Sequence, residues 1–340
     1  MTEKYKFPVH SLDVNIAKIL SSIASVELLG NIPKDLNNKI RFFDEGEHIS
    51  YVAKISKDII TGLCTTRLSI AYCQFLWLIS NVSLKNTEFS IILEECKAEN
   101  KSITDFKNVI DIELSESPSQ LSQRLAPFGI PIDSYLDNLT NVKALLACNG
   151  FQKQQQLQLS MAFSLLNKEE NIDYTLFDDI HNDKQYELKT NSVYCYGITF
   201  ILLHELSHFE LGHLDKQTEE MQDEKDADIS AFWKIFVNVE ETTKYSANIG
   251  IICALFSLLL MNPTLEGDET HPREDNRIFQ VYDDIKNENK KYGILIKHLF
   301  DYWGKYFSIN GYPSGLPNNE DSLEEIRSFL NERTVFEVTR

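Results

Sequence analysis

The amino-acid sequence has 340 residues, which is enough for about two domains and for a hydrophobic core that needs no disulfide or metal. Hydrophobic residues make up 43% of the chain and charged residues 25%, as in ordinary globular proteins, so intrinsic disorder and fibrous repeats are excluded. The formal net charge is −18. Because this charge would repel a phosphate backbone, we expect no nucleic-acid partner.

The distribution of apolar residues and cysteines is typical of a cytoplasmic protein. The chain begins MTEKYKFPVH, without the apolar run of a signal peptide. The longest apolar stretch, 251–261, is much shorter than the roughly 20 residues that cross a bilayer, so it predicts a buried core helix. The 6 cysteines include no CxxC pair and are expected to be reduced core residues. We therefore expect a cytoplasmic location and no membrane partner.

The first part of the chain has the apolar pattern of helices. Apolar residues recur at three- and four-residue spacing over 12–26 and again over 52–59. Residues 63–84 are apolar almost all round, which predicts a central buried helix. Glycine and proline are sparse, at 13 and 9 residues, so few turns are forced. These patterns predict a helical N-terminal part.

A segment rich in proline and serine, 115–134, is the best candidate for a domain boundary. We predict a helical domain over 1–135 and a second domain over 136–340. In the second domain, the alternation of polar and apolar residues at 156–161 fits either a short strand or a helix, and another strand is expected near 186–196. The expected fold is therefore mainly α, with a small β-sheet at most.

Two helices joined by an acidic segment are expected in the second domain. The first can be capped by Asn191 or Ser192, and Gly212 can end it. The segment that follows, 215–228, carries seven carboxylates and two lysines. A second, apolar helix is expected to begin near its end and to include Phe232.

The first of these helices carries the sequence HELSH. His204 and His208 lie four residues apart, so both imidazoles share one face of the helix and can bind a single metal ion. Glu205 lies beside them, where its carboxylate can take a proton from a water held by that ion. Zinc lowers the pKa of such a water to about 7. The motif therefore predicts a zinc hydrolase.

Two histidines leave one protein ligand to be found. Glu224 and Asp228 are the first and last residues of EKDAD, four apart and so on one face of the second helix. Glu224 is the predicted third ligand, and Asp228 is predicted to accept the second ring N–H of a ligand histidine and so fix its tautomer. Glu219 and Glu220 are rivals that fall in an expected loop, where a solvated role is favoured.

A third histidine, His213, follows nine residues after His204. If the helix continued to it, its side chain would face the opposite side, so we expect a surface residue or a cation at the helix C-terminus. A metzincin would carry glycine and histidine where Leu211 and Leu214 stand, which excludes that pattern.

HELSH followed by EKDAD resembles the pattern of the gluzincin metallopeptidases, which is HExxH and then ExxxD on a following helix. The segment Thr270-His271-Pro272, with Arg277 behind it, is similar to a downstream segment of some gluzincins. The short gap and the acidic linker are most similar to the phage-exclusion peptidases of the Lit type. The ImmA/IrrE-type peptidases are next nearest, although they usually carry Asn where Asp228 stands. The resemblance covers about 190–280 and does not reach the helices expected before 135.

The resemblance implies a gluzincin-like peptidase domain that binds Zn²⁺ and cleaves a protein substrate. A Lit-type activity would act on an intracellular protein, such as a host translation factor, in antiphage defence. It would need a trigger, and the region 1–135 is then the expected binding place for an activating protein or peptide. His271 would donate a hydrogen bond to the oxyanion or order its loop, and Arg277 would pair with the acidic linker or with substrate.

Two other functions are compatible with the same residues. The chain can be a metal-binding sensor or regulatory protein with a structural or vestigial zinc site, and a fourth protein ligand such as His213 would favour it. It can also be a helical toxin that acts by sequestering a partner.

Overall fold

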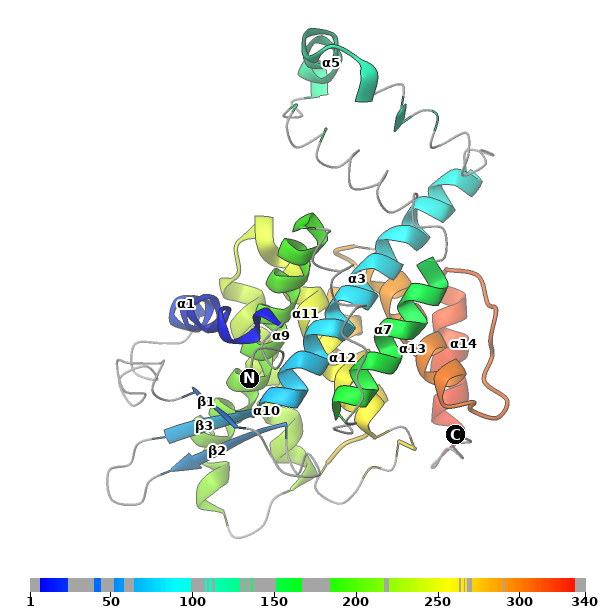
Figure 1. Ribbon diagram of the computed structural model, residues 1–340. Coiled ribbons are helices and arrows are strands. Elements are labelled where there is room, and N and C mark those ends of the chain that lie inside the picture. Colours follow the sequence, from blue (N-terminus) through cyan, green and yellow to red (C-terminus); the bar gives the residue numbers. More distant parts are fainter. Residues whose placement is uncertain are drawn as a thin grey trace.

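The computed structural model is built around α9 (Lys184–Glu210), a long helix with other helices on several sides (Figure 1). α9 packs against α11 (Glu241–Met261), α10 (Met221–Asn238), α3 (Ile70–Ala98) and α1 (Asp13–Ile23). The structure describes residues 7–23, 40–43, 52–57, 64–98, 108, 110–111, 114–128, 132, 136, 151–166, 184–216, 220–262, 264–265, 267, 271–289 and 291–333. The fold is mainly α, as the sequence predicts.

Three further helices pack against α3 or α11, and a fourth packs against one of those three. α7 (Phe151–Leu166) and α13 (Lys291–Tyr306) pack against α3, α12 (Glu274–Ile285) packs against α11, and α14 (Glu320–Asn331) packs against α13. One hydrophobic core runs through these helices and α9.

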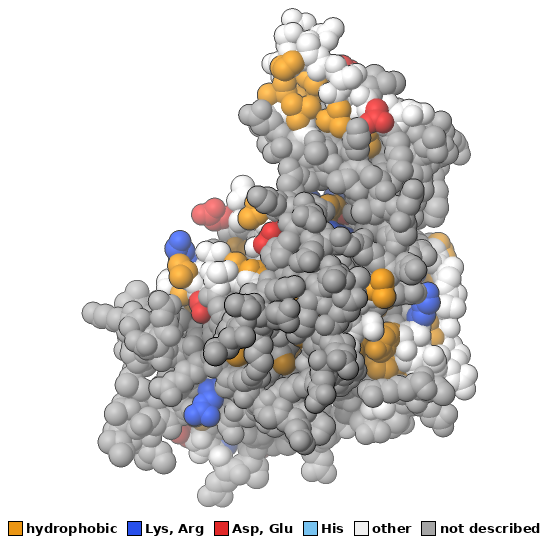
Figure 2. All heavy atoms as spheres, viewed as in Figure 1, with side chains coloured by type: hydrophobic (Ala, Val, Ile, Leu, Met, Phe, Trp, Pro, Cys, Tyr) orange, Lys and Arg blue, Asp and Glu red, His pale blue; other side chains and the backbone are white. Residues whose placement is uncertain are grey.

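The other helical elements with bounds in the described part of the chain are short. They are η1 (Pro8–His10), α5 (Pro118–Leu125), η3 (Ala126–Phe128) and η4 (His213–Asp215). α5 lies at one end of the molecule, apart from the other labelled helices (Figure 1). Hydrophobic side chains gather at that end in the space-filling view (Figure 2).

A three-stranded sheet precedes α3. It contains β1 (Ile40–Phe43), β2 (Ala53–Lys57) and β3 (Cys64–Ser69) in the order β1-β3-β2. β1 is parallel to β3, with Phe42 opposite Leu68, and β2 is antiparallel to β3. β3 leads directly into α3. The predicted helix at 52–59 is therefore wrong, and the buried helix predicted from 63 begins only at 70. In the short window around β2, helix and strand spacing fit equally well, and pairing with distant residues decides between them.

The sheet also lies in a different part of the chain from the strands that the sequence suggested. Residues 156–161, which fitted either a strand or a helix, belong to α7, and residues 186–196 belong to α9, so the strand predicted near 186–196 is wrong. α9 begins at Lys184, so Asn191 does not cap it and lies inside it. α9 is buried on several faces, and its apolar positions therefore lack the one-sided pattern that identifies an amphipathic helix.

Side-chain hydrogen bonds join α3 to α9. Trp77 Nε1 donates to Asn191 Oδ1 at 2.8 Å, and Asn81 Nδ2 donates to Thr190 Oγ1 at 2.9 Å. These contacts link helices that the sequence assigned to two domains. The predicted boundary itself, at 135, lies outside the described residues, so the two-domain division stays a prediction.

α9 and α11 approach each other closely at two glycines. A Cβ atom added to Gly250 would lie 2.5 Å from the backbone oxygen of Val193, and one added to Gly197 would lie 3.0 Å from the backbone oxygen of Gly250. Only glycine leaves room for this approach, because neither backbone oxygen can rotate away. This close contact between α9 and α11 fixes α9 against the core on the N-terminal side of the HELSH sequence.

α11 contains the apolar stretch at 251–261. It is the one described helix that is long and apolar enough to cross a membrane, and 72% of its most apolar window is buried inside the protein. Such burial is what a core helix of a soluble protein shows, and the predicted core helix is confirmed. Cys73, Cys195 and Cys253 are likewise buried and free, and burial raises the pKa of each thiol to about 12.

Candidate metal centre

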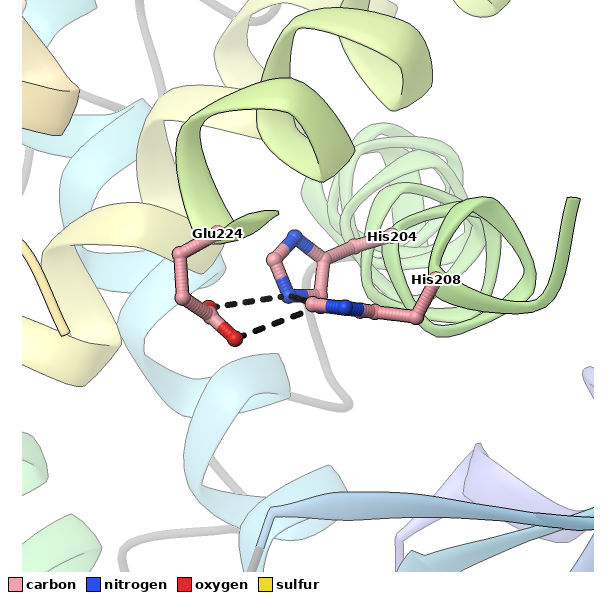
Figure 3. A group of neighbouring side chains, drawn as sticks. All are labelled: His204, His208 and Glu224. Atoms are coloured by element: carbon pink, nitrogen blue, oxygen red, sulfur yellow. Dashed lines mark hydrogen bonds and ion pairs between the residues drawn. The ribbon is translucent and has the colours of Figure 1, made fainter. Parts of the chain in front are cut away.

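Three side chains from α9 and α10 converge on one point (Figure 3). Glu224 Oε2 lies 3.3 Å from His204 Nε2, and Glu224 Oε1 lies 3.3 Å from His208 Nε2. The two Nε2 atoms are 3.1 Å apart. Two atoms that each lie about 2.0–2.1 Å from a tetrahedral zinc ion are about 3.3 Å apart. The three side chains therefore have both the chemistry and the spacing of a group that holds a metal ion.

The local sequence accounts for this convergence. His204 and His208 are one turn apart on α9, so their rings point the same way. Gly212 has φ 74°, a left-handed conformation that ends α9 and reverses the chain. A capping box between Glu220 and Asp223 then begins α10, and it places Glu224 in the first turn of that helix.

Asp228 and Arg277 support the centre from behind His204. Asp228 Oδ1 lies 2.9 Å from His204 Nδ1, the ring nitrogen that faces away from Glu224. Arg277, on α12, donates to both Asp228 oxygens, with Nε 2.6 Å from Oδ2 and Nη2 2.7 Å from Oδ1. Both side chains are buried. Arg277 thus pairs with Asp228, the last carboxylate of the acidic segment 215–228, which is one of the two partners that the sequence left open.

The centre carries strong electrostatic attraction for a cation. Burial alone would lower the pKa of His204, but hydrogen bonds with Asp228 and Glu224 raise that pKa to about 9. Burial would raise the pKa of Glu224, yet the hydrogen bonds from His204 and His208 lower it well below its usual range. Burial would raise the pKa of Asp228, but Arg277 and His204 lower it to about 2. At neutral pH the metal-free centre therefore holds two carboxylates around a protonated His204.

Zinc binding should release about one proton from His204 at pH 7, because a ring protonated with a pKa of about 9 must become neutral to bind metal. The proton and the metal compete for Nε2, so the apparent zinc affinity should rise with pH up to about 9. Calorimetry in two buffers of different ionisation enthalpy measures the release. Asp228→Asn removes the largest interaction that raises the pKa of His204, so this variant should release fewer protons on binding zinc than the wild type. Equal proton release by both proteins would contradict the electrostatic account.

Glu205 and His271 have different positions relative to the centre. Glu205 follows His204 on α9, and its side chain is partly buried. His271 lies at a bend before α12 with an exposed side chain, and it is not among the three residues that converge on the point between α9 and α10. Thr270 and the rival ligand Glu219 lie outside the described residues, whereas Glu220 is exposed at the N-cap of α10. The catalytic roles of Glu205 and His271 stay predictions.

The sequence predicted that His213 faces away from the centre, and this prediction is wrong. It assumed that α9 continues to His213, whereas the helix ends at Glu210 and the chain reverses at Gly212. His213 is consequently buried with its Nδ1 3.1 Å from His208 Nδ1. Asp223, which the sequence grouped with the acidic linker, is also buried and lies on the other side of the His213 ring. The signal for both placements was Gly212, a recognisable helix end.

Comparison with known proteins adds one finding. The family model Peptidase U49 matches residues 151–297, and this segment contains His204, His208, Glu224, Asp228 and Arg277. The match indicates a peptidase. Searches of curated proteins and of solved structures find no match.

Proposed function

We propose that the protein is a zinc-dependent endopeptidase, with His204, His208 and Glu224 as the zinc ligands and Glu205 as the general base. The single observation that carries the proposal is the spacing of 3.1–3.3 Å between the three ligand atoms, inside a segment that matches a peptidase family. Asp228, held by Arg277, keeps His204 in the tautomer whose Nε2 is free.

The proposed chemistry gives each of these groups one role. Zinc, when bound, supplies a Lewis acid that lowers the pKa of a coordinated water to about 7. Glu205 takes the proton of the attacking water and later gives it to the amine that leaves. His271, from the segment before α12, is the proposed hydrogen-bond donor to the oxyanion.

A structural zinc site is the main alternative, and it needs a fourth protein ligand. In the part of the chain that the structure describes, the converging group contains three residues. His213, the fourth ligand that this alternative would use, contacts the Nδ1 atom of His208, on the side of the ring away from Glu224. These contacts favour an open coordination position, as a hydrolase requires.

The substrate and the biological role extend the proposal. The Lit-type peptidases, which HELSH and EKDAD resemble, belong to the Peptidase U49 family. We infer a cytoplasmic protein substrate, such as a host translation factor, cleaved in antiphage defence. Such an activity must be restrained until infection, and residues 1–135 are the proposed binding region for an activating protein or peptide.

Comparison of protein N-termini in phage-infected cells tests this function. Cells that express the wild type should gain new N-termini in one or a few abundant host proteins, and cells that express Glu205→Gln should not. The same new N-termini with both proteins would contradict a peptidase that depends on Glu205. Cleavage of another protein class would contradict the translation-factor proposal alone.

A further inference from the structure

His208 is in contact with protein groups on both sides of its ring. Its Nε2 atom faces Glu224 and His204 in the converging group. Its Nδ1 atom lies 3.1 Å from Nδ1 of His213. His213 Nε2 in turn lies 3.4 Å from Asp223 Oδ1. A row of three groups, Asp223, His213 and His208, therefore leads to the metal centre.

Metal binding to His208 determines where each proton of this row lies. A neutral histidine that binds metal through Nε2 carries its proton on Nδ1. That Nδ1–H points at His213 Nδ1, which must accept and so must carry its own proton on Nε2. The Nε2–H of His213 faces the Asp223 carboxylate, which only accepts when ionised. One set of tautomers therefore satisfies all three groups and leaves Nε2 of His208 free.

The positions of His213 and Asp223 are fixed by their surroundings. The side chain of His213 is 8% exposed and that of Asp223 is 3% exposed. Asp223 forms an ion pair with Lys216 and accepts from the backbone N–H of Glu220 at 3.3 Å. These two contacts hold the carboxylate in place beside His213.

We propose that His213 is a positioning residue for His208: it accepts the Nδ1–H of His208, and Asp223 orients His213 for that role. The inference rests on the proposed zinc site and assigns His208 a support that corresponds to Asp228 behind His204. The turn that joins the two metal-binding helices then does more than connect them, because it supplies one of the groups that orient the ligands.

Two variants of His213 separate this role from simple packing. Asn places its amide oxygen near the position of the histidine Nδ1 atom, so His213→Asn keeps an acceptor for His208. His213→Leu has a similar volume and no acceptor. A chromophoric chelator in competition measures the zinc affinity of each full-length protein, and Co²⁺ absorption reports the number of ligands.

We expect zinc affinity to fall by about 10–100-fold in His213→Leu and to stay near wild type in His213→Asn, as for other groups that orient metal ligands. The Co²⁺ spectrum should keep the same intensity in the wild type and in His213→Leu, because no ligand is lost. Should His213→Leu fail to fold, His213→Gln replaces it: its longer side chain places the amide near the Nε2 position, so it should also bind zinc more weakly.

Equal zinc affinity in the wild type and in the variant without an acceptor would overturn the proposal. A weakened His213→Asn whose Co²⁺ spectrum changes intensity would also overturn it, because His213 would then be a ligand. A wild type that binds no zinc would instead contradict the proposed zinc site, so the two failures are distinguishable.

Discussion

Glu205→Gln should lower the rate of peptide hydrolysis by about 10²–10⁴-fold, the usual contribution of a positioned general base, and should leave zinc content unchanged. Glutamine keeps the size of the side chain and removes the proton acceptor. The three proposed ligands, His204, His208 and Glu224, are untouched. Steady-state kinetics on a peptide that spans a mapped cleavage site measures the rate.

Glu210→Gln is a matched control in the same helix. Glu210 is exposed and pairs with Lys234, away from the converging group, so its variant should keep full activity. A metal-binding sensor predicts the opposite pattern, in which Glu205→Gln keeps biological activity and only the histidine variants lose it. That pattern would contradict the enzymatic function and leave the metal site in place.

Arg277→Leu should lower the free energy of unfolding by about 3–5 kcal/mol, because it leaves the carboxylate of Asp228 buried without its strongest partner. Urea unfolding of the metal-free protein measures this loss without a contribution from bound zinc. Adding Asp228→Asn should recover part of the stability, since the neutral amide still accepts from His204 and no longer needs a cation.

Arg327 offers a matched control for the buried pair. It also donates to both oxygens of an aspartate, Asp283, but both side chains are about a third exposed. Solvent screens such a pair, so Arg327→Leu should cost about 0–1 kcal/mol. Equal losses from Arg277→Leu and Arg327→Leu would contradict the idea that burial makes the Asp228 pair important.

The residues of the candidate site could be identified from the sequence because their relations are local. His204 and His208 are four apart, as are Glu224 and Asp228, and helical periodicity places each pair on one face. The structure brings the three predicted ligands together between the two predicted helices. Short-range patterns are reliable when a single helix determines the geometry.

Relations that depend on the path of the chain could not be identified. Arg277 binds Asp228, 49 residues earlier, and nothing in the spacing indicates that α12 returns to α10. His213 was misplaced because one left-handed residue, Gly212, changed the direction of the chain. The place of the sheet was missed because β1 and β3 pair residues that are far apart in the sequence, such as Ile40 and Thr66. Tertiary contacts decide such features, and local propensity does not.

The metal content of the purified protein tests the central claim most directly. Elemental analysis should find about one zinc per chain in the wild type and in Glu205→Gln, and almost none in His208→Ala, because removing one of three protein ligands leaves too few to hold the ion. A zinc content in His208→Ala equal to that of the wild type would contradict the assignment of His204, His208 and Glu224 as the metal centre.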